Sequence, residues 1–198
     1  MLVLTTAAAV MSCLAATPPA TADFWVPVKA GRITHDCSGK DPLVMCMQGR
    51  KVLIQVLLDH ATGFSYKARF FNLRQEAPNQ PQILFDAGRE LIPAIRVADQ
   101  PLPVQWPSTA TFDGSLTLTY PAGAGVVTTR KVYPSTTKDL VVEEWHLRNT
   151  TDKPVRVSVA SARKVNSNME KFAIVWTCQG VPATSLQPGA VLSFATSL

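Results

Sequence analysis

The sequence predicts an all-β fold, an antiparallel two-sheet β-sandwich of supersandwich type, on three observations. Residues 125–160 contain three segments rich in β-branched residues, separated by polar turn clusters, a spacing typical of sandwiches. Leu116, Leu118 and Tyr120 alternate with threonines, which is the period of a strand with one buried face. No long stretch shows the 3.6-residue period of an amphipathic helix.

Individual strands are expected where apolar or alternating runs lie between turn residues. They are 51–58, 64–73, 82–88, 90–98, 116–120, 126–133, 140–148, 155–159, 172–178 and 190–195. The run 51–58, KVLIQVLL, is nearly all apolar, which predicts a strand buried on both faces. The connection before residue 64 ends in Gly63 and favours a hairpin. Six prolines between residues 78 and 107 limit strands there to short or edge positions.

Residues 1–22 are expected to be a secretory signal peptide. This stretch is apolar, too short to span a bilayer, and ends in Ala20-Thr21-Ala22, a triplet that signal peptidases accept. The alternative is a lipoprotein cleavage site at Cys13, but Met11 fits the sequence pattern of such a site poorly. The expected location is therefore secreted or periplasmic, with no transmembrane segment. Residues 23–198 are expected to form a single β-sandwich domain.

The charge pattern argues against a nucleic-acid partner. The net charge is +5, but the basic residues are scattered and no run of Lys or Arg exceeds two. The histidines, His35, His60 and His146, lack the spacing of a zinc site. The sequence contains no phosphate-binding loop and no nucleophile elbow. We therefore expect no cofactor, no metal site and no catalytic residue.

Two cysteines of the exported chain are candidates for a disulfide. Cys37 and Cys46 flank the turn-bearing span SGKDPLVM, whose ends can meet across a hairpin. Thiols can oxidise in an exported protein. We expect a bridge between Cys37 and Cys46, which leaves Cys178 as a buried thiol.

Glu143 is the first candidate for a substrate-binding residue. On the segment 140–148, Glu143 shares a face with Val141, Trp145 and Leu147. Burial raises the pKa of a carboxyl group, which would suit Glu143 to act as a general acid or to form a hydrogen bond with a sugar hydroxyl. One alternative is that Arg130 or Lys131 on the preceding strand pairs with Glu143, since buried charges are usually paired. The other is that Glu143 lies at the edge of the sheet.

Glycoside hydrolysis needs two carboxyl groups about 5–10 Å apart. Glu143 and Glu144 are adjacent and point to opposite faces, so they are not such a pair. Asp86 with Glu90, or Asp139 with Glu143, remain as alternatives.

Two tryptophans are the further candidates for sugar contact, because sugar rings stack on aromatic side chains. Trp106 lies in the polar segment QWPSTATFDG and Trp25 lies near the mature N-terminus. For Trp106 the alternative is an anchor packed under the proline-rich segment. Trp145 and Trp176 lie inside strand patterns and are expected in the core.

The segments 131–159, KVYPSTTKDLVVEEWHLRNTTDKPVRVSV, and 186–198, LQPGAVLSFATSL, resemble the N-terminal β-sandwich, or supersandwich, of multidomain bacterial glycoside hydrolases. The resemblance implies a noncatalytic sandwich that packs against a helical barrel carrying the catalytic carboxylates. The chain ends at Leu198, where that barrel is expected to begin. It is therefore expected to be either part of a longer protein or a free-standing relative.

The expected function is that of an exported, noncatalytic β-sandwich module of a glycoside-hydrolase-like protein. Its role is expected to be structural or carbohydrate-contacting, with a carbohydrate or the missing helical catalytic domain as partner. The alternative is a stand-alone exported sandwich that binds a protein partner through an edge strand. A complete small enzyme is the third option.

Overall fold

The structure, a computed structural model, describes residues 26–29, 31–39, 41–70, 83–87, 91–103, 106–166 and 173–198. Its regular structure is β-strand apart from one 3₁₀ turn, η1 (Cys37–Gly39). Every strand pairing is antiparallel. The predicted all-β, sandwich-like class is therefore confirmed. No helix in the described ranges has the length and apolar character needed to cross a membrane.

The described strands form three sheets, one more than the two-sheet sandwich that was expected. The large sheet contains, in spatial order, β1 (Val26–Lys29), β2 (Arg32–Asp36), β9 (Thr109–Phe112), β10 (Leu116–Thr119), β11 (Val126–Pro134), β12 (Val141–Asn149), β17 (Val191–Ser197), β15 (Ile174–Cys178) and β14 (Ala162–Asn166). The small sheet contains β3 (Leu43–Gln48), β4 (Val52–Asp59), β5 (Gly63–Phe70) and β6 (Ile83–Ala87). The end sheet contains β16 (Val181–Leu186), β13 (Val155–Val159), β7 (Ile95–Val97) and β8 (Gln100–Pro101).

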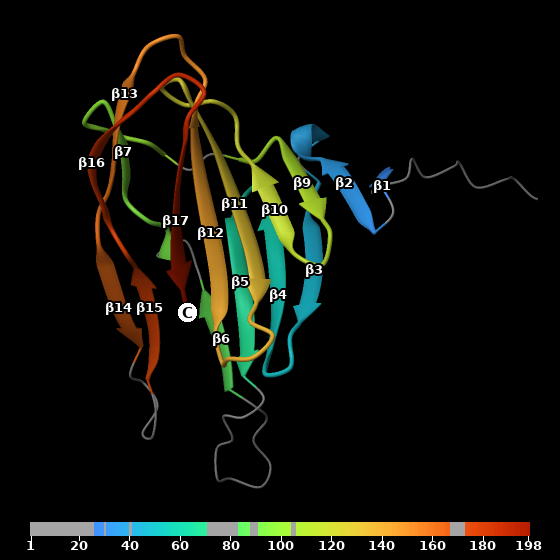
Figure 1. Cartoon of the computed structure of the whole chain (residues 1–198). Coiled ribbons are helices and arrows are strands. Elements are labelled where there is room, and N and C mark those ends of the chain that lie inside the picture. Colours follow the sequence, from blue (N-terminus) through green and yellow to red (C-terminus); the bar gives the residue numbers. More distant parts are fainter. Residues whose placement is uncertain are drawn as a thin grey trace, which may run out of the picture.

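The small sheet lies against the central strands of the large sheet (Figure 1). Alternate side chains of β4, β10, β11 and β12 are buried between them, as expected for strands with one face in a sandwich core. Val157 and Val159 of the end sheet belong to the same apolar cluster. One continuous core therefore joins all three sheets.

The strand 51–58 was expected to be buried on both faces, and this is wrong. Its counterpart β4 buries Val52, Ile54, Val56 and Leu58, whereas the other face is partly or fully accessible. Leu57 on that outer face is 36% exposed. The apolar run therefore supplies one core face and one apolar outer face. The hairpin from β4 to β5 is confirmed.

The turn 149–154 does not join its flanking strands as a hairpin. It carries the chain from β12 in the large sheet to β13 in the end sheet. Asn149 is fully buried, and its amide donates to the carbonyl oxygens of Lys153 at 2.7 Å and Leu186 at 2.9 Å. Its Oδ1 accepts hydrogen bonds from the N–H and hydroxyl of Thr151. Asn149 thus fixes a crossover between sheets.

Several strands lie outside the segments in which strands were expected. They include β2, β3, β9, β14 and β16. These segments are only four to six residues long, so each gives a weak period-two signal of its own. They become strands because the neighbouring sheets supply hydrogen-bonding partners.

Candidate functional site

A hollow of about 350 Å³ opens on the outer face of the small sheet. It is lined by Val44, Gln55, Leu57, Thr62, Ser65, Tyr66 and Lys67. The ladder places these residues together, because Val44 lies opposite Leu57, Leu57 opposite Ser65, and Gln55 opposite Lys67. Three strands and one turn therefore build the hollow.

The hollow combines an apolar floor with hydrogen-bonding groups. Val44 is 57% and Leu57 is 36% exposed, so both present apolar surface to solvent. Around them, Gln55 offers a donor and an acceptor, Ser65 a hydroxyl and Lys67 an ammonium group. Ligand sites are usually concave and mostly apolar with a few polar groups that orient the ligand, and the residues lining this hollow have that composition.

The turn at the end of the hollow is shaped by Asp59. Its Oδ1 accepts hydrogen bonds from the backbone N–H of Ala61 at 2.8 Å and of Thr62 at 2.9 Å. The N–H of Thr62, and next that of Ala61, hold the pKa of the Asp59 carboxyl below its ordinary value. Gly63 completes the turn with a φ of +81°, a conformation that favours glycine. Asp59 thereby positions Thr62 beside the hollow.

Glu143 does not face solvent but lies between the sheets, where it pairs with Arg130. The guanidinium donates through Nε at 3.0 Å and Nη2 at 2.8 Å to the two carboxylate oxygens. The side chains of Glu143 and Arg130 are 1% and 2% exposed. Of the alternatives that the sequence left open, the charge pair with Arg130 is the one present. A sugar on the surface therefore has no access to Glu143.

The buried pair is surrounded by aromatic rings and further polar atoms. The Arg130 guanidinium lies 3.8 Å from the Phe64 ring centroid and 4.8 Å from that of Trp145. Burial lowers the pKa of Arg130, but the Glu143 carboxylate raises it, with a net increase, so Arg130 stays charged. Burial, together with Glu143, raises the pKa of Tyr66 well above its ordinary value. This cluster links β5 to the large sheet.

Trp106 is half-buried and packs against the core. Its Nε1–H donates to the Cys37 carbonyl oxygen at 2.8 Å, and its ring meets that of His60 edge-on with centroids 5.2 Å apart. The loop-anchor alternative therefore describes Trp106 better than a free stacking platform. Trp145 and Trp176 are buried, as predicted. Trp25, like the expected signal peptide 1–22, lies outside the described residues.

Cys37, Cys46 and Cys178 are all free thiols, so the expected bridge between Cys37 and Cys46 is absent. Cys37 is buried in η1 beside the large sheet, whereas Cys46 is exposed on the small sheet. In β3 the inward residues are Leu43 and Met47, which turns Cys46 outward. The two thiols thus point to different environments. Cys178 is buried, as expected.

The remaining carboxylate candidates do not form a pair in the described part of the structure. Asp139 pairs with Lys51 at 3.5 Å on the surface, apart from buried Glu143. Glu90 and the Asp86 side chain lie outside what the structure describes. Within the described ranges, no three His, Cys, Asp or Glu residues are grouped so as to hold a metal ion.

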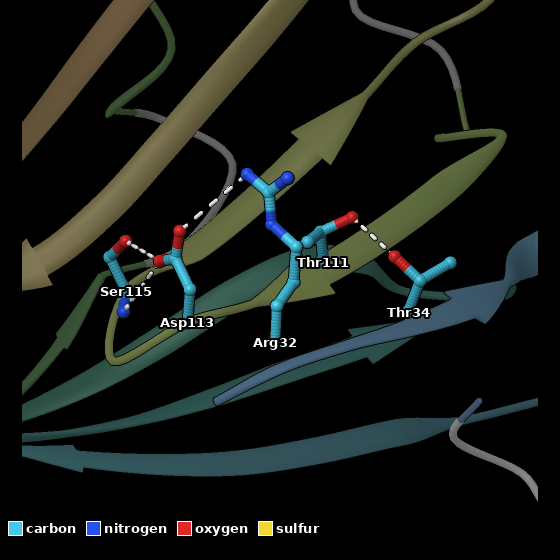
Figure 2. A network of polar contacts seen from close by, with 5 residues as sticks. All are labelled: Arg32, Thr34, Thr111, Asp113 and Ser115. Atoms are coloured by element: carbon cyan, nitrogen blue, oxygen red, sulfur yellow. Dashed lines mark hydrogen bonds and ion pairs between the residues drawn. The ribbon is translucent and has the colours of Figure 1, made fainter. Parts of the chain in front are cut away.

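A second polar group lies on the outer face of the large sheet, where β2 meets β9 (Figure 2). The hydroxyls of Thr34 and Thr111 are hydrogen-bonded at 2.6 Å, and Arg32 approaches Asp113 to 3.8 Å. The Ser115 hydroxyl donates to Asp113 Oδ1 at 2.7 Å and is the main cause of a lowered Asp113 pKa. These contacts join neighbouring strands and a turn, so this network supports the pairing of β2 with β9.

No protein-family model matches the chain, and none of the curated proteins is significantly similar to it. The functional argument therefore rests on the hollow and its surroundings.

Proposed function

We propose that this chain is an exported, noncatalytic β-sandwich module of a glycoside-hydrolase-like protein that contacts carbohydrate through the hollow on the small sheet. The hollow carries the proposal, because it places Val44 and Leu57 next to the amide of Gln55 and the ammonium of Lys67. The C–H face of a sugar ring packs on apolar side chains, while its hydroxyls exchange hydrogen bonds with amides, hydroxyls and ammonium groups.

The residues of the hollow are suited to bind a carbohydrate without hydrolysing it. Glycoside hydrolysis uses two carboxyl groups on either side of the bond, and the residues that line the hollow include no carboxylate. Glu143 is engaged by Arg130 between the sheets. Its charge supports the fold rather than a reaction.

A glycan array probed with the isolated chain tests the contact with carbohydrate. For the best-bound glycan, Gln55→Ala and Lys67→Ala are each expected to weaken binding about tenfold, the loss expected for one hydrogen bond to a charged or well-placed group. Arg69→Ala is the matched control, because Arg69 is exposed on the same face of β5 but does not line the hollow. Absence of glycan binding, or equal loss in the control, would refute the carbohydrate role.

Export and modular origin have separate tests. N-terminal sequencing of the protein from the culture medium or periplasm is expected to begin at Asp23, after cleavage behind Ala22. Sequencing of the gene beyond the Leu198 codon is expected to reveal a helix-patterned region with acidic residues. Retention of the protein in the cytoplasm would contradict export, and a stop codon directly after Leu198 would contradict the modular origin.

A further inference from the structure

The described strands leave six sheet edges, and β3 differs from the other five. Each of the others contains a proline or a charged residue, which are the usual means of preventing edge-to-edge association. These are Pro27 and Lys29 in β1, Asp86 in β6, Pro101 in β8, Arg163 and Lys164 in β14, and Pro182 in β16. β3, with the sequence LVMCMQ, has neither.

The free side of β3 is available for pairing. Among the described residues, its backbone hydrogen bonds run to β4 alone. An edge strand directs every second N–H and C=O away from its sheet. Val44 is the most exposed of the large apolar side chains identified in the structure, and Cys46 beside it is an exposed thiol. β3 thus presents unpaired backbone groups next to apolar surface.

The sequence around β3 is complementary to itself. Met45 and Met47 flank Cys46 symmetrically, so antiparallel pairing centred on Cys46 places each Met45 opposite Met47 of a second copy. The charges at the two ends of the strand also match. Exposed Asp41 precedes β3 and exposed Arg50 follows it. Antiparallel pairing brings the acidic end of one copy to the basic end of the other.

We propose that β3 is a self-pairing edge through which two copies of this chain form a two-fold symmetric dimer, with Cys46 at the centre. A two-fold interface uses the same surface on both copies, which the symmetric strand allows. The two small sheets then become one continuous antiparallel sheet. Directly opposed residues share a face, so both hollows open on the same side of that sheet. The pairing does not depend on what the hollow binds.

Sedimentation velocity of the reduced chain, from low micromolar to submillimolar concentration, tests the dimer. The wild type is expected to pass from monomer to dimer, and Cys46→Lys is expected to remain monomeric, because it brings two ammonium groups together at the symmetry axis. Ala195→Lys is the matched control: Ala195 is exposed on β17, an interior strand of the large sheet, and this variant is expected to dimerise normally. A wild type that stays monomeric, or a dimer that survives Cys46→Lys, overturns the proposal.

Thiol crosslinking tests the register. Diamide takes up two hydrogens as two thiols form one disulfide, and the expected product is a covalent dimer joined through Cys46. Cys37 and Cys178 are buried and do not substitute for it. Cys46→Ser is expected to abolish the crosslink yet retain the noncovalent dimer. A noncovalent dimer without any Cys46 crosslink overturns the register centred on this residue.

Discussion

Arg130 on β11 holds Glu143 on β12 through two hydrogen bonds in the middle of the sandwich, where both side chains are almost fully buried. The two residues are not directly opposite, since Arg130 faces Trp145 and Glu143 faces Val132 in the ladder. The pair is therefore a diagonal contact on the inward face. It compensates two charges that neither strand could bury alone.

Removal of one partner is expected to be costly. Glu143→Ala should lower the free energy of unfolding by about 3–5 kcal/mol, because it leaves the Arg130 charge buried without a counter-charge. Glu144→Ala is the control on the outward face, where the Glu144 carboxylate accepts a hydrogen bond from Tyr133 at 2.7 Å, and it should cost only about 1 kcal/mol. Urea denaturation measures both.

A double-mutant cycle separates the pair from its surroundings. The double variant Arg130→Met, Glu143→Leu should lose much less free energy of unfolding than the two single variants lose together, because no unpaired charge remains in the core. Additive losses would contradict the interpretation of the pair as mutual compensation.

Gly49 is expected to resist replacement. A Cβ at this position would collide with the main-chain oxygen of Ser135, a contact that joins the β3–β4 turn to the large sheet. Gly49→Ala should therefore destabilise the fold by about 1–3 kcal/mol, as overpacking does. Gly39→Ala is the matched case, because its nearest neighbour is the movable tip of the Asp41 side chain at 3.0 Å. Thermal unfolding measures the stability of both variants. Equal melting temperatures for Gly49→Ala and Gly39→Ala would contradict the close approach of Gly49 to the Ser135 oxygen.

The buried thiol of Cys37 is expected to react slowly. Burial, with a smaller contribution from Asp36, raises its pKa from 9.0 to about 11, so almost none is thiolate near neutral pH. Exposed Cys46 should be alkylated first, with Cys37 modified only on unfolding. Mass spectrometry of peptides after timed iodoacetamide treatment measures the order, and faster labelling of Cys37 would contradict its burial.

The raised pKa of the Cys37 thiol also predicts a loss of stability at alkaline pH. The folded state favours the neutral Cys37 thiol, so its contribution is complete below pH 9 and declines as pH rises toward 11. Cys37→Ala should reduce the fall in unfolding free energy over this interval. Burial also raises the pKa values of Tyr66 and Tyr120. These two residues should therefore cause part of the fall in unfolding free energy in the wild type and in Cys37→Ala alike. An unchanged slope in the variant would show that Cys37 does not contribute.

Trp106 is expected to matter for stability. Trp106→Phe removes the hydrogen bond to the Cys37 carbonyl and should cost about 1 kcal/mol. Trp106→Ala should cost more, because it also removes the ring contact with His60 and the packing against the core. Denaturant unfolding followed by circular dichroism measures both. If Trp106→Ala abolishes glycan binding without loss of stability, Trp106 is a sugar contact after all.

Much of the central architecture could be predicted from alternation. β10, β11, β12 and β13 all lie where period-two patterns indicated, and the inward face of β12 contains Val141, Glu143, Trp145 and Leu147 as expected. Alternation also placed Arg130 within reach of Glu143 as one of two candidate partners. Lys131 was excluded by the structure, which places it on the opposite, outward side of β11.

The candidate site could not be predicted in the same way. Its residues lie on β3, β4, β5 and a turn, and no strand was expected at β3, where Cys46 was expected to form a disulfide with Cys37. Nothing in the local sequence indicates that Val44 lies opposite Leu57, or that Lys67 lies opposite Gln55. The alternation of side chains is a local property of the chain, so the sequence by itself determined the strands of the core and their buried faces. Pairing between strands depends on hydrogen bonds and burial contributed by distant segments, so only the tertiary structure decided the partner of Glu143, the free thiols, the hollow and the unprotected edge of β3.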